Sequence, residues 1–87
     1  MAKRRSDRQP RHRLAKFPRL REYRETRLGW EVTDLTSKLP NGRPSISSIY
    51  RLEQGFAIRF ASAKRVFDVV NEALGGILKA DQELVKG

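Results

Sequence analysis

Apolar side chains recur every three or four residues along the middle of the chain, which is the spacing of helices that bury one face. This pattern predicts a first helix over residues 18–28, where Pro18 suits the first turn and Gly29 follows as a stop. A second helix is predicted over residues 31–39. The residues expected to share one face are Leu20, Tyr23, Arg27 and Leu28 on the first helix and Val32, Leu35, Thr36 and Leu39 on the second.

Two further helices are predicted after a break at residues 40–44, which read Pro-Asn-Gly-Arg-Pro. Ser45 is a favourable N-cap for a third helix over residues 46–54, which Gly55 closes. A fourth helix is predicted over residues 62–74, before a pair of glycines. The inward positions of the third and fourth helices are Ile49, Leu52, Val66, Phe67, Val70, Ala73 and Leu74.

No segment alternates apolar and polar residues with a period of two, so no strand is predicted. The expected fold class is therefore all-α, a compact domain of four to five helices over residues 17–75. Residues 1–16 are predicted to form a flexible basic arm, because polar and highly charged segments cannot offset their ordering entropy. Residues 76–87 are expected to form a short tail and a candidate dimer contact. The candidate anchors of this tail are Ile77, Leu78, Leu84 and Val85.

The chain is strongly basic, with 19 Lys and Arg against 10 Asp and Glu and a net charge of +9. Residues 1–27 hold 11 of the basic side chains and only 3 of the acidic ones. This lopsided charge predicts a polyanionic partner, more often nucleic acid than an anionic membrane. The arm is expected to follow a nucleic-acid backbone or enter a minor groove through Lys3, Arg4 and Arg5.

The residue inventory argues against several classes of protein. No apolar run approaches the ~20 residues of a membrane span, and no apolar stretch of a signal peptide follows the basic start, so a cytoplasmic chain is expected. Cysteine is absent, histidine occurs once, and no pair of carboxylates has metal-ligand spacing. We therefore expect no metal, no cofactor and no enzymatic activity. A domain this small without disulfides or metal is expected to depend on helix packing or on self-association, and we predict a homodimer.

Four segments occur in the order typical of one family: LREYRE, GWEVTDLTSKL, SISSIYRLEQG and AKRVFDVVNEALGG. The most specific piece is Arg-Leu-Glu-Gln-Gly at residues 51–55, preceded by Ser-x-x-x-Ile at residues 45–49. Over about residues 19–75 the chain resembles the Cro/phage-repressor (XRE-like) family of helix-turn-helix proteins. The resemblance implies a lambda-repressor-like domain whose third helix enters the major groove of double-stranded DNA.

The resemblance also implies roles for individual residues. It places on the DNA-facing side of the third helix, or beside it, Ile46, Ser47, Ser48, Tyr50 and Arg51. In such a fold Arg43, in the long turn, is expected to contact the phosphate backbone, and the helix N-termini near Thr33 and Ser45 are expected to offer free N–H groups to phosphates. It implies a structural ion pair between Arg24 and Glu53.

The chain departs from the family's pattern at several positions. Trp30 stands where leucine is usual, and Val32 stands where a polar DNA-contacting residue is common. Asn71 stands where a small apolar residue is expected, and residues 39–45 form a longer turn than usual. Two positions stay open: Tyr50 lies between the seam and the exposed face, and Ile46 suits a thymine contact or a core staple equally.

Three functional classes are compatible with these observations. The first is a dimeric, sequence-specific transcription regulator of a phage or mobile-element type, acting as repressor or dual regulator on an operator. The second is an antitoxin or protein-interaction module that uses residues 76–87 and binds DNA secondarily. The third is an RNA- or ribosome-associated basic protein, which prefers single strands stacked on aromatic side chains.

Overall fold

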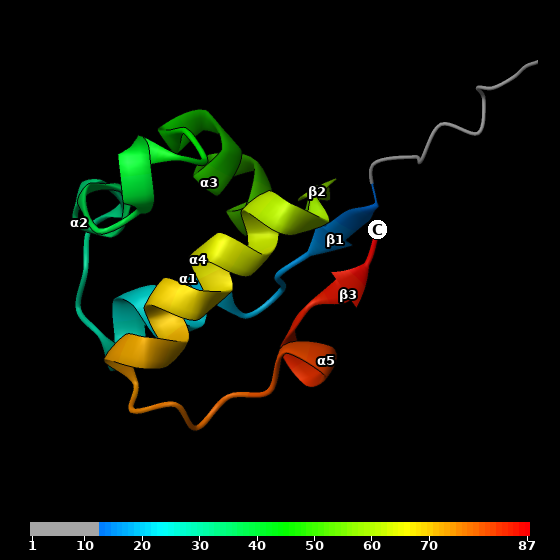
Figure 1. Ribbon diagram of the computed structural model, residues 1–87. Helices are drawn as coiled ribbons and strands as arrows, with labels where there is room; N and C mark the ends of the chain where they lie inside the picture. The colour runs from blue at the N-terminus through cyan, green and yellow to red at the C-terminus, as the bar shows by residue number, and fades with distance from the viewer. Residues whose placement is uncertain (1–12) are drawn as a thin grey trace, which may run out of the picture.

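The computed structural model describes residues 13–87, so the predictions made for Lys3, Arg4 and Arg5 lie outside the described residues. Its elements are shown in Figure 1. In chain order they are β1 (Leu14–Lys16), α1 (Leu20–Glu22), η2 (Tyr23–Arg27), α2 (Val32–Ser37), η3 (Pro40–Gly42), α3 (Ile46–Glu53), β2 (Ile58–Arg59), α4 (Phe60–Ala73), α5 (Ala80–Glu83) and β3 (Val85–Lys86).

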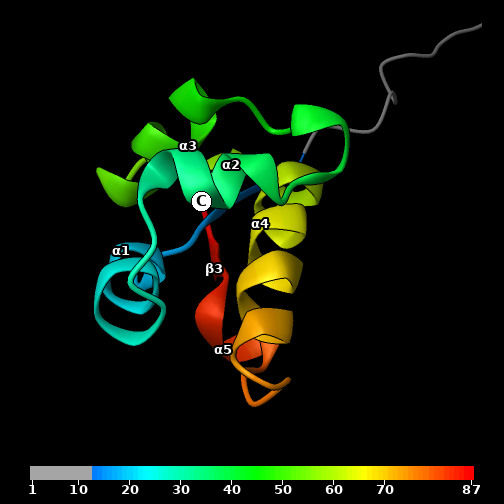
Figure 2. The ribbon, with the colours of Figure 1, turned by 90° about the vertical axis from the view of Figure 1, so that its left-hand side faces the viewer.

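The helices follow the predicted apolar periodicity, with differences at their ends. The first predicted helix divides into α1 and a π-helical turn, η2, in which the Leu28 N–H donates to the Tyr23 carbonyl at 2.9 Å. The break predicted at residues 40–44 contains the short 3-10 turn η3. In Figure 2 α2 crosses the front beside α3, while α1 and α4 lie below on either side.

Gly55 ends α3 as its position predicts. Its φ of +96° places it in the left-handed region, where a side chain is strained. The Gly55 N–H donates to the Leu52 carbonyl at 3.1 Å, and the Phe56 N–H donates to the Arg51 carbonyl at 2.9 Å. This pair of bonds is a Schellman cap, and it satisfies carbonyls that the helix end would otherwise leave free.

The prediction of an all-α, lambda-repressor-like domain is wrong, because three short strands form an antiparallel sheet in the order β2-β1-β3. Leu14 pairs with Arg59, and Ala15 pairs with Ile58 on one side and Lys86 on the other. Strands of two or three residues are too short to show a period of two, and their partners lie far apart in sequence. Hydrophobic patterning therefore gave no sign of them.

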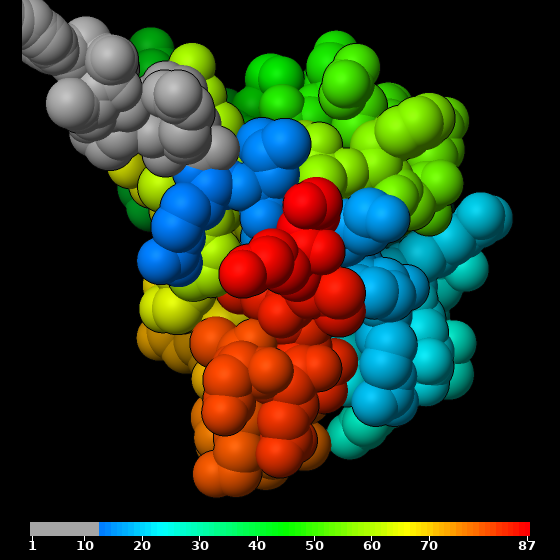
Figure 3. All heavy atoms as spheres, turned by 90° about the vertical axis from the view of Figure 1, so that its right-hand side faces the viewer, coloured from blue at the N-terminus to red at the C-terminus, as the bar shows by residue number. Residues whose placement is uncertain are grey.

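The sheet also changes the boundaries expected for the arm and the tail. Residues 14–16, placed in the arm by their charge, form the central strand, and Ala15 is buried. Residues 80–86 of the tail form α5 and β3, and Figure 3 shows the C-terminal residues lying against β1. Leu84 is only 9% exposed, so this part of the tail belongs to the core of the domain.

Polar contacts join the tail to the helices as well. The Tyr23 hydroxyl donates to Glu83 Oε2 at 2.8 Å. Burial, and next the hydrogen bond to this carboxylate, raise the pKa of Tyr23 above its ordinary value. Asn71 is satisfied locally, because its Oδ1 accepts the Leu78 N–H at 2.8 Å.

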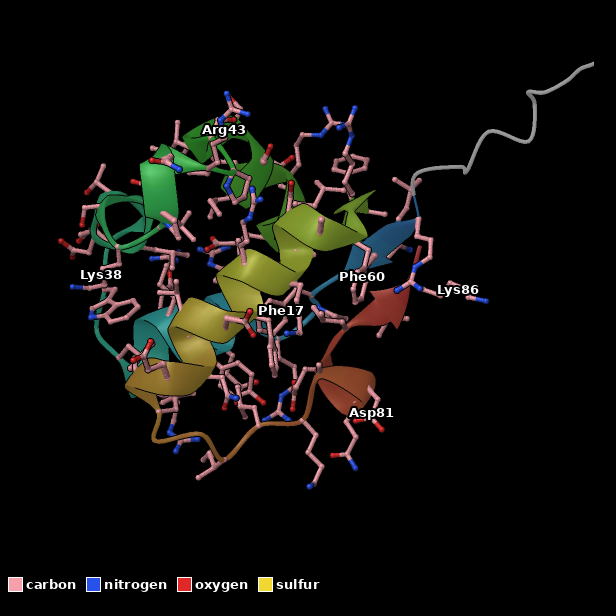
Figure 4. All side chains as sticks on the ribbon, in the orientation of Figure 1. Phe17, Lys38, Arg43, Phe60, Asp81 and Lys86 are labelled. Atoms are coloured by element: carbon pink, nitrogen blue, oxygen red, sulfur yellow. The ribbon has the colours of Figure 1, made fainter. Side chains whose placement is uncertain are left out.

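The core lies between the helices and the sheet, with Phe17 fully buried at its centre (Figure 4). The Phe17 ring packs tilted against Tyr23 and Phe67, at centroid distances of 6.2 and 5.9 Å. Trp30 is partly buried and packs against the same cluster. Most of the residues predicted for the inner helix faces are buried, namely Leu20, Val32, Leu35, Leu39, Ile49, Leu52, Val66 and Val70. The prediction is wrong for Ala73, which is exposed in the last turn of α4, and for Arg27, which is exposed at the end of η2, while Leu28 and Leu74 are only partly buried.

Candidate nucleic-acid interface

The helix α3 presents two faces of different character. Ile49 and Leu52 are buried against the rest of the domain, where α3 packs on α2. Ser47, Tyr50 and Arg51 lie on the opposite face, and all three are exposed. The uncovered face of α3 is therefore polar, aromatic and basic, and we call Ile46, Ser47, Tyr50 and Arg51 the exposed α3 face.

The structure decides the two positions that the sequence left open. Tyr50 is 49% exposed, and Ile46 is exposed at the start of the helix, so neither belongs to the core. Both side chains are thus available to a partner of the exposed α3 face.

Phe56 extends this face, and sequence reasoning did not find it. It is exposed just after the Gly55 cap, and the Arg51 guanidinium lies over its ring at 5.8 Å from the centroid. Such a cation–π contact restricts the orientation of the guanidinium while leaving its N–H groups accessible. The only sequence signal for this contact is the short spacing of the two residues across a helix end.

Ser45 occupies the N-cap position of α3 with extended backbone, as predicted, but its hydroxyl makes no capping hydrogen bond. Its Oγ lies 3.5 Å from the Ser48 Oγ instead. The first-turn N–H groups of α3 therefore have no side-chain partner among residues 13–87. Free N–H groups at a helix start favour an anion.

The start of α2 has the opposite character. Thr33 is exposed there, but it lies between Glu31 and Asp34, and Asp34 Oδ2 accepts the Glu31 N–H at 2.8 Å. These carboxylates satisfy the helix start and repel phosphate. The phosphate contact expected for Thr33 has no support from its surroundings.

Arg43 lies in the turn between α2 and α3, and its side chain is exposed at the α3 end of the molecule (Figure 4). No carboxylate among the described residues lies within 4.0 Å of its guanidinium. The position leaves its charge available to an anion beside the start of α3.

Arg24 and Glu53 form an ion pair that attaches α3 to the rest of the domain. Arg24 Nε and Nη2 donate to the two Glu53 oxygens at 2.6 and 2.9 Å, and the side chains are 7% and 8% exposed. Arg24 Nη1 also donates to the Trp30 carbonyl at 2.8 Å. The hydrogen bond to Glu53 raises the pKa of Arg24 above its ordinary value, so the guanidinium stays charged.

No family model, curated protein or solved structure matches the chain. Within residues 13–87 no helix has the length and apolar character that a membrane span requires. The same part of the chain has no group of three or more His, Cys, Asp or Glu able to hold a metal ion. The described residues nevertheless form one distinctive surface, the exposed α3 face with Arg43 beside it.

Proposed function

We propose that the protein is a sequence-specific regulator of transcription that binds double-stranded DNA through α3. The observation that carries this proposal is the two-faced character of α3. Its inner face is buried, its C-terminal end is attached through Glu53 to Arg24, and its outer face is basic and uncovered. A helix fixed in this way is a rigid reader of the size that the major groove, ~12 Å wide, admits.

The exposed side chains supply the chemistry for reading base edges. Arg51 offers two parallel N–H donors that match O6 and N7 of guanine, and the Ser47 hydroxyl can donate or accept. Ile46 fits against a thymine methyl group, and Tyr50 can donate to a phosphate. A good bidentate contact contributes about 1–3 kcal/mol of discrimination between bases.

The wider proposal concerns how such a regulator acts. A homodimer places two copies of α3 on the two halves of a palindromic operator, since protein and DNA symmetry match. Occupation of the operator then represses transcription by blocking a promoter, or, for a dual regulator, activates it. The regulator is of a phage or mobile-element type, and it acts on the nucleoid in the bacterial cytoplasm. It has no catalytic activity.

Selection from a pool of random duplexes tests this proposal. The expected result is an enriched motif with two-fold symmetry. Arg51→Ala and Ser47→Ala each reduce the preference for this motif over random duplex, whereas Arg27→Ala, at an exposed arginine of η2, leaves the preference unchanged. A pool that yields no motif, or Arg51 and Ser47 variants with unchanged preference, contradicts the proposal.

Single-stranded nucleic acid is the competitor that one observation favours. Tyr50 and Phe56 are exposed on either side of Arg51 in sequence, and exposed aromatic rings stack on unpaired bases. Binding to a single strand and to its duplex is therefore compared at the same salt concentration. Stronger binding to the single strand, lost in Phe56→Ala, supports the competitor and contradicts duplex reading.

A further inference from the structure

A groove lies beside the start of α3, between the α2–α3 turn and the first turns of α4. Its volume of about 730 Å³ falls within the ~300–1,000 Å³ range of ligand sites. Three arginines from separate positions line it: Arg43 from the turn, Arg59 from the N-cap of α4, and Arg65 from its second turn. Figure 2 shows this turn lying over the N-terminal end of α4. We call this feature the arginine groove.

The charge of the arginine groove is unbalanced. No acidic residue lines it, and none of the three arginines has a carboxylate within 4.0 Å in the described part of the chain. The closest acidic residue along α4, Asp68, is paired with Lys64 at 2.9 Å. Three like charges on one concave surface repel one another, so an anion in the groove is favoured.

Other donors in the groove suit a phosphate group in particular. Ser45, Ser48 and Ser62 add hydroxyls to its walls. Both α3 and α4 begin there, and neither start has a side-chain cap among residues 13–87. At the start of α4 the Phe60 N–H donates to the Arg13 carbonyl at 2.6 Å, so the first-turn N–H groups of α3 are the ones that bear on the groove. Planar guanidinium groups, hydroxyls and free N–H groups are the donors that bind phosphate oxygens.

We propose that the arginine groove binds a phosphodiester segment of the duplex, so that one DNA strand is held beside the first turn of α3. That the phosphate belongs to DNA rests on the proposed function. That the groove binds an anion rests only on the residues that line it. Ser48 lines the groove, while the adjacent Ser47 lies on the exposed α3 face. A DNA strand held in the arginine groove is thus one of the strands that border the major groove of the DNA that α3 enters. This adds Arg59 and Arg65 to the DNA-binding residues and makes the long turn part of the interface.

The salt dependence of duplex binding tests the proposal. Replacement of Arg43, Arg59 and Arg65 by glutamine, singly and together, is compared with a matched replacement of Lys16, Lys79 and Lys86. The slope of log K against log[salt] is negative, and each lost phosphate contact reduces its magnitude by about 0.9. The affinity lost between 50 and 200 mM salt is then smaller by a factor of about 3.5. Affinity for specific and random duplexes is expected to fall equally. If the arginine variants have the same slope as the lysine control, the arginine groove does not hold a DNA strand and the proposal is overturned. The proposed function is tested separately, by Arg51→Ala.

Titration with inorganic phosphate tests the anion site without DNA. In wild-type protein the Nε–Hε NMR signals of Arg43, Arg59 and Arg65 are expected to shift, while that of Arg27 does not. Phosphate shifts combined with an unchanged salt slope identify a free anion as the ligand and overturn the strand assignment. If the protein binds no duplex at all, the proposed function fails, and the phosphate titration alone tests whether the arginine groove is an anion site. Shifts confined to the three arginines then support the site, and their absence overturns it.

Discussion

Replacing Glu53 with alanine removes the carboxylate that accepts two hydrogen bonds from Arg24, at 2.6 and 2.9 Å. The guanidinium that remains is 7% exposed, and its partners within residues 13–87 are then the Trp30 carbonyl and the outer carboxylate of Glu25. Breaking a buried pair in this way costs about 3–5 kcal/mol, because the buried guanidinium loses the carboxylate that pairs with it most closely. The whole domain is expected to be stable by about 4–11 kcal/mol at ~0.05–0.15 kcal/mol per residue. The single substitution therefore removes a large share of the folding free energy.

Urea and thermal denaturation followed by circular dichroism measure this loss. For a domain of this size each kcal/mol lowers Tm by about 4–8 °C, so Glu53→Ala is expected to lower it by roughly 12–40 °C. The matched control is Asp68→Ala, which removes the exposed ion pair with Lys64 and is expected to change stability by less than about 1 kcal/mol. Equal effects of the two substitutions would refute the assignment of Arg24 and Glu53 as a buried pair.

Three further predictions concern stability and use chemical denaturation. Leu84→Ala is expected to destabilise the domain by about 2–5 kcal/mol because Leu84 is buried, whereas Ile77→Ala, 62% exposed, changes stability by less than about 0.5 kcal/mol; similar values would show that the tail does not pack as described. Gly55→Ala is expected to cost about 1–2 kcal/mol from backbone strain alone, since no atom crowds the added Cβ, and a neutral result would contradict the left-handed cap. Burial beside Glu83 raises the pKa of Tyr23 in the folded state, so the folded state retains a proton that the unfolded state releases, and the free energy of unfolding should fall as pH rises above the ordinary value of 10.0. Tyr23→Phe should make that fall shallower, and an unchanged pH profile would contradict the shift.

The helical part of the fold was open to prediction because its signals are local. Apolar spacing marked the buried faces of α3 and α4, and Gly55 marked the end of α3 through the backbone conformation that it permits. The Arg24–Glu53 pair was accessible only through the family resemblance, since no local pattern connects residues 29 positions apart.

The sheet and the arginine groove could not be predicted from the sequence, because both are formed by contacts between residues far apart along the chain. Strand β1 acquires its structure from backbone bonds to β2 and β3, which lie more than forty residues away along the chain. In the sequence Arg59 lies before the helix predicted over residues 62–74 and Arg65 lies within it, and no motif marks either of them as part of an anion site. Only the folding of the long turn over α4 brings Arg43 to the same groove.

Replacement of both members of the buried pair separates their contribution to stability from their effect on α3. Arg24→Met combined with Glu53→Leu removes both charges and keeps much of the volume, and such replacements are often neutral or stabilising. The double variant is therefore expected to recover most of the stability lost in Glu53→Ala. It lacks the two directional bonds at the C-terminal end of α3, so under the proposed function its preference for the selected motif should fall while its salt slope stays the same. A folded double variant with full preference would show that packing alone positions α3, and that the ion pair serves stability only.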